Sequence, residues 1–177
     1  MANPSWRFHM ENDVRRSART RAIVAGGLIA AALDAANALV AYKLAFGMKP
    51  LAIYQFVASG LLGSAAYAAG LASGALGLAV HFLIAFTAAA LFVIASERLP
   101  QLRRDALGWG LLYGVVVFVV MSFVVIPLSR IPSSTPSVPL LVDGVVAHAL
   151  LVGLPISLAA RRYLGRPERP ALSGAVA

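Results

Sequence analysis

The sequence contains no cysteine and few charged residues, and both absences narrow what the protein can be. Without cysteine the chain has no disulfide, no thiolate metal site and no thiol nucleophile. Only 12% of the 177 residues are charged, which is about half the share in a typical soluble domain. Because 60% of the residues are apolar, too little polar surface remains to cover a globule in water. The composition therefore predicts an integral membrane protein.

The motifs of common enzymes are also missing. The sequence has no phosphate-binding glycine loop, no helical His-Glu-x-x-His site and no flanked serine nucleophile. We therefore expect no enzymatic activity, no metal site and no cofactor, with a b-type haem between His81 and His148 as an alternative. The net charge of +8 comes from short basic clusters between apolar runs, so we expect a lipid bilayer and no nucleic acid as partner.

Four apolar runs are long enough to cross a hydrocarbon core of about 30 Å, which takes about 20 helical residues. They occupy 22–46, 74–97, 108–128 and 139–160. A further apolar run at 51–70 is interrupted by glycines. We therefore expect an all-α integral membrane protein, a four-transmembrane-helix bundle within 22–163, in which 47–73 adds an outer interfacial or re-entrant helix.

The distribution of positive charge decides between four spans and five. With four spans, the N-terminal arm 1–21, the loop between spans two and three and the segment that leads into the tail 164–177 share one side. Together they hold every Lys and Arg except Lys43, Lys49 and Arg130. Because cytoplasmic segments are enriched in Lys and Arg, this pattern favours four spans with both termini in the cytoplasm. The composition of the tail predicts disorder.

Aromatic residues gather near both predicted membrane boundaries, as is typical of interfacial belts. The inner group is Trp109, Tyr113 and Tyr163, and the outer group is Tyr42, Phe46, Tyr54 and Phe56. Gln55 in the outer segment either lines a re-entrant pore or faces lipid headgroups, and we favour the headgroups.

Small residues recur at helical spacing, for example in the pairs Gly26–Ala30 and Gly70–Gly74. Such residues let helix backbones approach closely in lipid. We assign helix packing to Gly26, Gly27, Gly77, Gly110, Gly114 and Gly144. Packing within one chain is the simpler interpretation, and a homo-oligomer face or contact within a larger membrane complex is the alternative.

Spans two and four share a short pattern, because Gly77 precedes His81 and Gly144 precedes His148 by one helical turn. Both spans are predicted to run from outside to inside, so the two histidines fall at similar depth. This arrangement is compatible with a parallel two-helix repeat about an axis normal to the membrane.

The second half of the chain has a characteristic order of motifs. A glycine and histidine open an aromatic-rich span that ends in Glu97-Arg98-Leu99-Pro100, and then follow Gly110 to Gly114, Pro127-Leu128 and Gly144 to His148. This order resembles the YagU-like family of small bacterial inner-membrane proteins. The resemblance implies four spans with a long outer connector after the first and a location in the bacterial inner membrane. It implies no particular activity, because the family has none that is settled.

Asp34 lies about midway along the first span, with Asn37 on nearly the same helix face. An ionised carboxylate at the centre of a bilayer costs at least a few kcal/mol unless it is paired, hydrated or protonated. Asp34 is therefore either a proton or cation site that faces the bundle interior, or a structural group bonded to Asn37 or to a neighbouring helix. Asp143 suits the start of span four electrostatically and is otherwise simply hydrated.

The histidines leave similar alternatives. His81 and His148 can converge with Asp34 into a proton relay, or each can bond to a backbone carbonyl or hydroxyl. Three functions follow: a transporter or channel-like protein for protons, ions or a small solute, an accessory or structural subunit of a larger membrane complex, and a haem-binding electron carrier. The ion- or proton-binding candidates are Asp34, Asn37, His81, His148 and Asp143.

Overall fold

The computed structural model describes residues 5–131 and 137–167, and the regular structure in these ranges is helical. Four helices are long and apolar enough to cross a membrane, which confirms the predicted all-α bundle. They run over Met10–Phe46, Gly70–Arg98, Ala106–Leu128 and Val138–Leu164, and each contains one predicted span. The predicted disordered tail lies outside the described residues from 168 onward.

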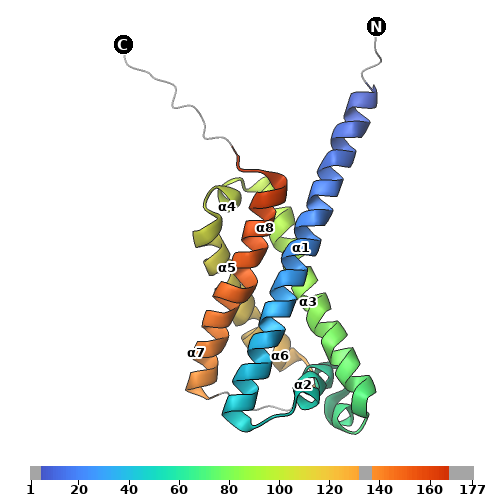
Figure 1. Cartoon of the computed structure of the whole chain (residues 1–177), viewed down its shortest axis with the longest axis vertical. Coiled ribbons are helices and arrows are strands. Elements are labelled where there is room, and N and C mark those ends of the chain that lie inside the picture. Colours follow the sequence, from blue (N-terminus) through green and yellow to red (C-terminus); the bar gives the residue numbers. More distant parts are fainter. Residues whose placement is uncertain (1–4, 132–136, 168–177) are drawn as a thin grey trace.

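Helix α1 (Ser5–Phe46) includes most of the basic arm, so the arm continues the first span as one helix. It projects beyond the bundle at the end where α8 (Leu154–Leu164) finishes, and the described chain therefore begins and ends on one side (Figure 1). Arg19 of α1 forms a two-fold ion pair with Glu97 of α3 (Gly70–Arg98), with N–O distances of 2.9 and 3.0 Å. This pair ties the arm to the bundle.

At the opposite end, α2 (Pro50–Leu62) and η1 (Gly63–Tyr67) form the additional helical segment (Figure 1). Proline suits the first turn of a helix, because its fixed φ is helical and the missing N–H has no helical partner there. Helix α2 packs on α3 where Gly77 leaves room for the Tyr54 carbonyl, and a methyl group added at Gly77 would overlap that carbonyl.

Gln55 does not face headgroups, and that expectation is wrong. Its side chain is buried, and its amide nitrogen donates to the Gly70 carbonyl at 3.1 Å and to Ser73 Oγ at 3.3 Å. A polar side chain at a helix contact gains more from such bonds than from partial hydration. Gln55 therefore fixes α2 against the start of α3.

The third and fourth spanning helices each contain a wider, π-helical turn. Helix α5 (Ala106–Val120) passes through η2 (Met121–Val125) into α6 (Ile126–Leu128), and α7 (Val138–Ala147) passes through η3 (His148–Gly153) into α8. Pro127 and Pro155 each follow two residues after such a turn. A proline ring displaces the carbonyl four residues earlier, and a local change of register relieves that clash. Turns of this kind are frequent at functional sites.

Glycines set how closely the helices approach. Gly26 lies against α8 and Gly27 against Phe86 of α3, while Gly110 lies against Ser157 and Gly114 against the His148 carbonyl. Gly144 faces the Phe118 ring, so all six predicted packing glycines, Gly77 included, contact another helical segment. Gly153, which the sequence analysis missed, lies against Gly110 and Gly114.

Gly70 has a different role from the predicted packing pair with Gly74. Its φ of +60° is a left-handed conformation that favours glycine, and no atom would lie within 4 Å of an added Cβ. Gly70 therefore makes the turn into α3, and only Gly74 packs, against Leu51.

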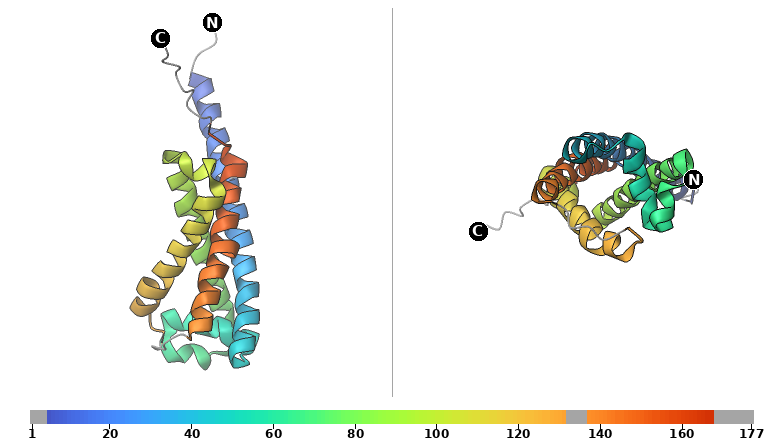
Figure 2. Two further views of the ribbon diagram at one scale, coloured as in Figure 1. Left: turned by 90° about the vertical axis from the view of Figure 1, so that its left-hand side faces the viewer. Right: turned by 90° about the horizontal axis from the view of Figure 1, so that it is seen from below.

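One half of the bundle is closed and the other is open. The closed half contains the apolar core, in which Phe92 and Ile156 are buried among alanines. Tyr113 of α5 bridges to α3 there, because its hydroxyl donates to the Ala88 carbonyl at 2.7 Å. In the other half the segment from α5 to α6 leans away from α7 (Figure 2). The space between these diverging helices is where the candidate site lies.

Candidate functional site

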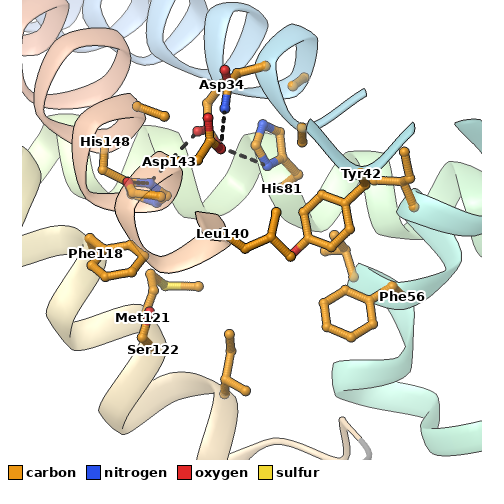
Figure 3. A pocket seen from close by; sticks show the side chains of 18 of the residues that line it. Asp34, Tyr42, Phe56, His81, Phe118, Met121, Ser122, Leu140, Asp143 and His148 are labelled. Atoms are coloured by element: carbon orange, nitrogen blue, oxygen red, sulfur yellow. Dashed lines mark hydrogen bonds and ion pairs between the residues drawn. The ribbon is translucent and has the colours of Figure 1, made fainter. Parts of the chain in front are cut away.

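A cavity of about 250 Å³ occupies the open half of the bundle, bounded by α1, α2, α3, α7 and the segment from α5 to α6. Several polar side chains converge on it (Figure 3). All five ion- or proton-binding candidates line this cavity: Asp34, Asn37, His81, Asp143 and His148.

Asp34 points inward because of the pattern of α1. Ala22, Gly26 and Ala30 are spaced by four residues, and residues at this spacing share a helix face. Ala22 and Ala30 are completely or almost completely buried against the other helices. Asp34 is the next residue of this stripe, at the level where the helices begin to diverge, and its side chain is 19% exposed.

The two histidines approach Asp34 from opposite sides. Asp34 Oδ2 lies 4.0 Å from Nδ1 of His81, and Asp34 Oδ1 lies 3.9 Å from Nδ1 of His148. The structure thus brings together three residues that lie on different spans. The histidines of both Gly-x-x-x-His patterns therefore lie beside the same carboxylate. The predicted repeat as a whole stays a prediction.

Backbone hydrogen bonds fix the orientation of both rings. His81 Nε2 lies 3.0 Å from the Ala31 carbonyl, and because a carbonyl only accepts, Nε2 carries the hydrogen. In the neutral ring Nδ1 then has a lone pair, and this lone pair faces the Asp34 carboxylate. The carboxylate and this lone pair are both acceptors, so a proton on either group could bridge them once they close from 4.0 Å to hydrogen-bond distance.

His148 bonds to the backbone through its other ring nitrogen, Nδ1, whereas His81 does so through Nε2. Its Nδ1 lies 2.9 Å from the Gly144 carbonyl one turn earlier and therefore donates to it, so Nε2 is the acceptor in the neutral ring. The Phe118 ring contacts the imidazole edge to face, with a centroid distance of 5.4 Å. The structural interpretation, a histidine bonded to a backbone carbonyl, thus holds for both rings and coexists with their position beside Asp34.

One interpretation of the sequence proposed a hydrogen bond between Asn37 and Asp34, but Asn37 bonds to a different residue. Its amide donates to Asp143 Oδ2 at 3.1 Å and links α1 to α7. Asp143 is partly buried and accepts this bond inside the cavity wall.

On α2, burial raises the pKa of Tyr54, and the nearby Asp34 carboxylate raises it further, so the phenol stays neutral at physiological pH.

Aromatic rings complete the wall. Of the predicted outer aromatic group, Tyr42, Tyr54 and Phe56 line the cavity, a role that the sequence did not predict, whereas Phe46 is 59% exposed. The Tyr42 and Phe56 rings lie 6.4 Å apart. The available signal was that Tyr42 follows Asp34 by about two helical turns.

A second cavity of about 110 Å³ lies on the other side of Asp34 and the two histidines, which also line it. Its remaining wall is apolar and includes Ala88 and Val152, which belong to or adjoin the closed core. Asp34 and its histidines therefore line both the larger cavity, where polar side chains gather, and a small apolar one that reaches the packed half of the bundle.

Among the described residues, no group of three or more His, Cys, Asp or Glu side chains is placed to hold a metal ion. The alternative of a b-type haem between His81 and His148 stays a prediction: each ring bonds to a backbone carbonyl through one nitrogen, and both rings lie beside the Asp34 carboxylate. No protein-family model, curated protein or solved structure matches the chain, and the resemblance to the YagU-like family stays a prediction.

Proposed function

We propose that the chain is a small membrane transporter that moves protons, alone or coupled to a small solute, through Asp34 and His81. One observation carries the proposal: a carboxylate faces two imidazoles between a polar cavity and the closed half of a membrane bundle. Ionisable residues inside spanning helices are costly, and paired Asp and His residues build proton relays in pumps and transporters.

The arrangement suggests how a proton would be held and passed on. A proton that enters through the larger cavity would reach Asp34 and be shared with Nδ1 of His81. Release toward the other side would require the apolar contact around Phe92 and Tyr113 to open, because these rings pack with their centroids 4.9 Å apart in the closed half. The two π-helical turns adjoin the site and are suitable points for such a movement.

The proposal extends to location. We place both termini in the cytoplasm and the protein in the bacterial inner membrane. Support comes from the cluster of basic residues, Arg19, Arg103 and Arg162 among them, around the end where α1 projects and α8 finishes, and from the YagU-like resemblance. We propose no enzymatic activity for the chain.

Proton flux into liposomes tests the function. Purified protein is reconstituted with an internal pH-sensitive dye, and a potassium diffusion potential drives proton entry. We expect flux in the wild type and a fall to the level of protein-free liposomes in Asp34→Asn. Asp105→Asn is the matched control, because Asp105 caps α5 by accepting the Gly108 N–H and asparagine caps equally well. Equal flux in Asp34→Asn and the wild type would reject the proposal.

A second candidate is an accessory subunit of a larger complex. The observation that favours it is an apolar groove of about 410 Å³ between α3 and α5, lined by residues such as Leu83, Leu91 and Val116. A helix of another subunit could cover such a groove. Native mass in a mild detergent tests this: a stable hetero-oligomer supports the accessory role, and a homo-oligomer alone contradicts it.

A further inference from the structure

The cavity of about 250 Å³ combines acidic side chains with aromatic rings, and its described lining includes neither Lys nor Arg. Among the described residues that line it, the ionisable ones are Asp34, Asp143, the two histidines and two tyrosines, and neither Lys nor Arg is present. Asn37 satisfies one oxygen of Asp143 but brings no positive charge. The cavity therefore favours a positively charged occupant.

The rings are placed on two sides of this acidic centre. Tyr42 of α1 and Phe56 of α2 lie together at one side, with their planes tilted by 38°, and Phe118 of α5 lies at the other side beside His148 (Figure 3). The face of an aromatic ring carries negative charge and attracts a cation, most strongly where water is excluded. Aromatic side chains also provide an apolar wall for the body of an organic ligand.

The size of the cavity limits the occupant further. A volume of about 250 Å³ lies just below the usual range of pockets for drug-sized ligands. A hydrated inorganic cation would gain little from the rings, whereas a small amine with one ring or a short aliphatic body would use both the carboxylates and the aromatic wall. Carboxylate and ring together are the features that recognise an ammonium group.

We propose that this cavity binds a small organic cation, a protonated amine, in exchange for the proton held by Asp34 and His81. The inference rests on the proposed transport function and names the substrate class of the same site. The ammonium group lies between Asp34 and Asp143, and the body of the amine lies among Tyr42, Phe56 and Phe118.

The exchange is balanced in charge. Before the cation binds, one proton would be held by the pair of Asp34 and His81, and the incoming cation would bring one positive charge while that proton leaves to water. The groups that face Asp34 come from four elements: His81 on α3, His148 on η3, Asp143 on α7 and Tyr54 on α2, with Tyr42 on its own helix. Because protons compete for the same carboxylate, affinity for the amine falls as the pH is lowered.

Binding to the full-length protein in detergent tests the inference with three probes of similar shape. Benzylammonium is a cation, benzyl alcohol is neutral and benzoate is an anion. We expect benzylammonium to bind at least about tenfold more tightly than benzyl alcohol, benzoate not to bind, and each bound cation to release up to one proton into weakly buffered solution. Equal binding of all three probes, or cation binding without proton release, would overturn the inference.

Two variants separate the charge from the rings. Asp34→Asn should abolish the preference for the cation. Phe56→Leu keeps an apolar side chain but removes the ring, so it should weaken the binding of benzylammonium by roughly threefold to tenfold and weaken the binding of benzyl alcohol less. Asp105→Asn at the opposite end should bind as the wild type does. An unchanged affinity in Phe56→Leu together with unchanged selectivity in Asp34→Asn would place the amine elsewhere and reject the site.

The binding assay and the proton-flux assay together distinguish the cation site from the transport proposal. Proton flux that depends on Asp34, without binding of benzylammonium, would leave the transporter and reject the organic cation. Selective binding that depends on Asp34, without proton flux in liposomes either in the absence or in the presence of a benzylammonium gradient, would leave the cation site and reject transport.

Discussion

Asp34 Oδ2 and Nδ1 of His81 face each other at 4.0 Å, and the other nitrogen of that imidazole is committed to the Ala31 carbonyl. Ala31 lies on the same helix as Asp34, less than one turn away. The backbone of α1 therefore aims the lone pair of His81 at the carboxylate of α1. The pair is positioned as a unit, and each member can be altered separately.

Glutamine at position 81 should separate the structural role of His81 from proton exchange. The amide nitrogen of His81→Gln can still donate to the Ala31 carbonyl, so we expect normal folding. The variant has no titratable nitrogen beside Asp34, and we expect proton flux in liposomes to fall about a hundredfold and its pH dependence to flatten. Wild-type flux with an unchanged pH profile would show that His81 is only structural.

Asparagine at position 148 should have a smaller effect. The amide of His148→Asn can replace the donor to the Gly144 carbonyl, and the pairing of Asp34 with His81 stays in place. We expect proton flux to fall less than about tenfold, measured in the same liposomes. A loss as large as in His81→Gln would show that both histidines carry the proton.

A methyl group at Gly77 should separate α2 from α3. In Gly77→Ala the added methyl would overlap the Tyr54 carbonyl, which belongs to a helix backbone and cannot turn aside. Overpacking of this kind typically costs about 1–3 kcal/mol, so we expect a lower midpoint of thermal unfolding in detergent. Because Tyr54 and Phe56 of α2 line the cavity, ligand affinity should fall as well.

The matched control lies on α2 itself. An added methyl at Gly60 would meet its nearest neighbours at 3.7 and 3.8 Å, which is ordinary contact. Alanine is also the better helix former by about 1 kcal/mol, so Gly60→Ala should leave the unfolding midpoint unchanged or raise it. If both variants lose the same stability, the contact between Gly77 and Tyr54 is not what limits the approach of the helices.

The spans were predictable because length and apolar composition alone define a membrane helix. The inward direction of Asp34 was also available in the sequence, since it continues the four-residue spacing of Ala22, Gly26 and Ala30. Convergence with His81 and His148 was not, because contacts between helices depend on how the bundle is arranged and on the approach that its glycines permit.

Other features of the site depend on context that a sequence pattern does not contain. An aromatic residue near a predicted membrane boundary has the same sequence pattern whether it is exposed on the outside of the bundle, as Phe46 is, or lines a cavity, as Tyr42 does. Asn37 lay beside Asp34 in the sequence pattern, yet its partner, Asp143, comes from α7 and could not be deduced from spacing. The π-helical turns likewise follow from prolines whose effect depends on neighbouring packing.

Loss of Arg103 should loosen the closed end of the bundle. Arg103 on α4 (Gln101–Arg104) donates from Nε to the Ser96 carbonyl at 2.9 Å and from Nη1 to the Leu164 carbonyl at 2.8 Å. It thereby joins the ends of α3 and α8, where helix carbonyls lack partners and favour a cation. Burial lowers the pKa of Arg103 from its ordinary value and Glu97 opposes this shift, so the guanidinium keeps its charge at physiological pH.

Arg103→Gln should therefore lower the free energy of unfolding by about 1 kcal/mol, a value discounted for the partial exposure of this side chain. Arg162→Gln removes the same charge from an exposed position on α8 and is the control. Thermal unfolding in detergent should show a lower midpoint only for Arg103→Gln. Equal midpoints would mean that the arginine contributes charge to this end of the bundle without joining the helix ends, and that the apolar core alone keeps the bundle closed there.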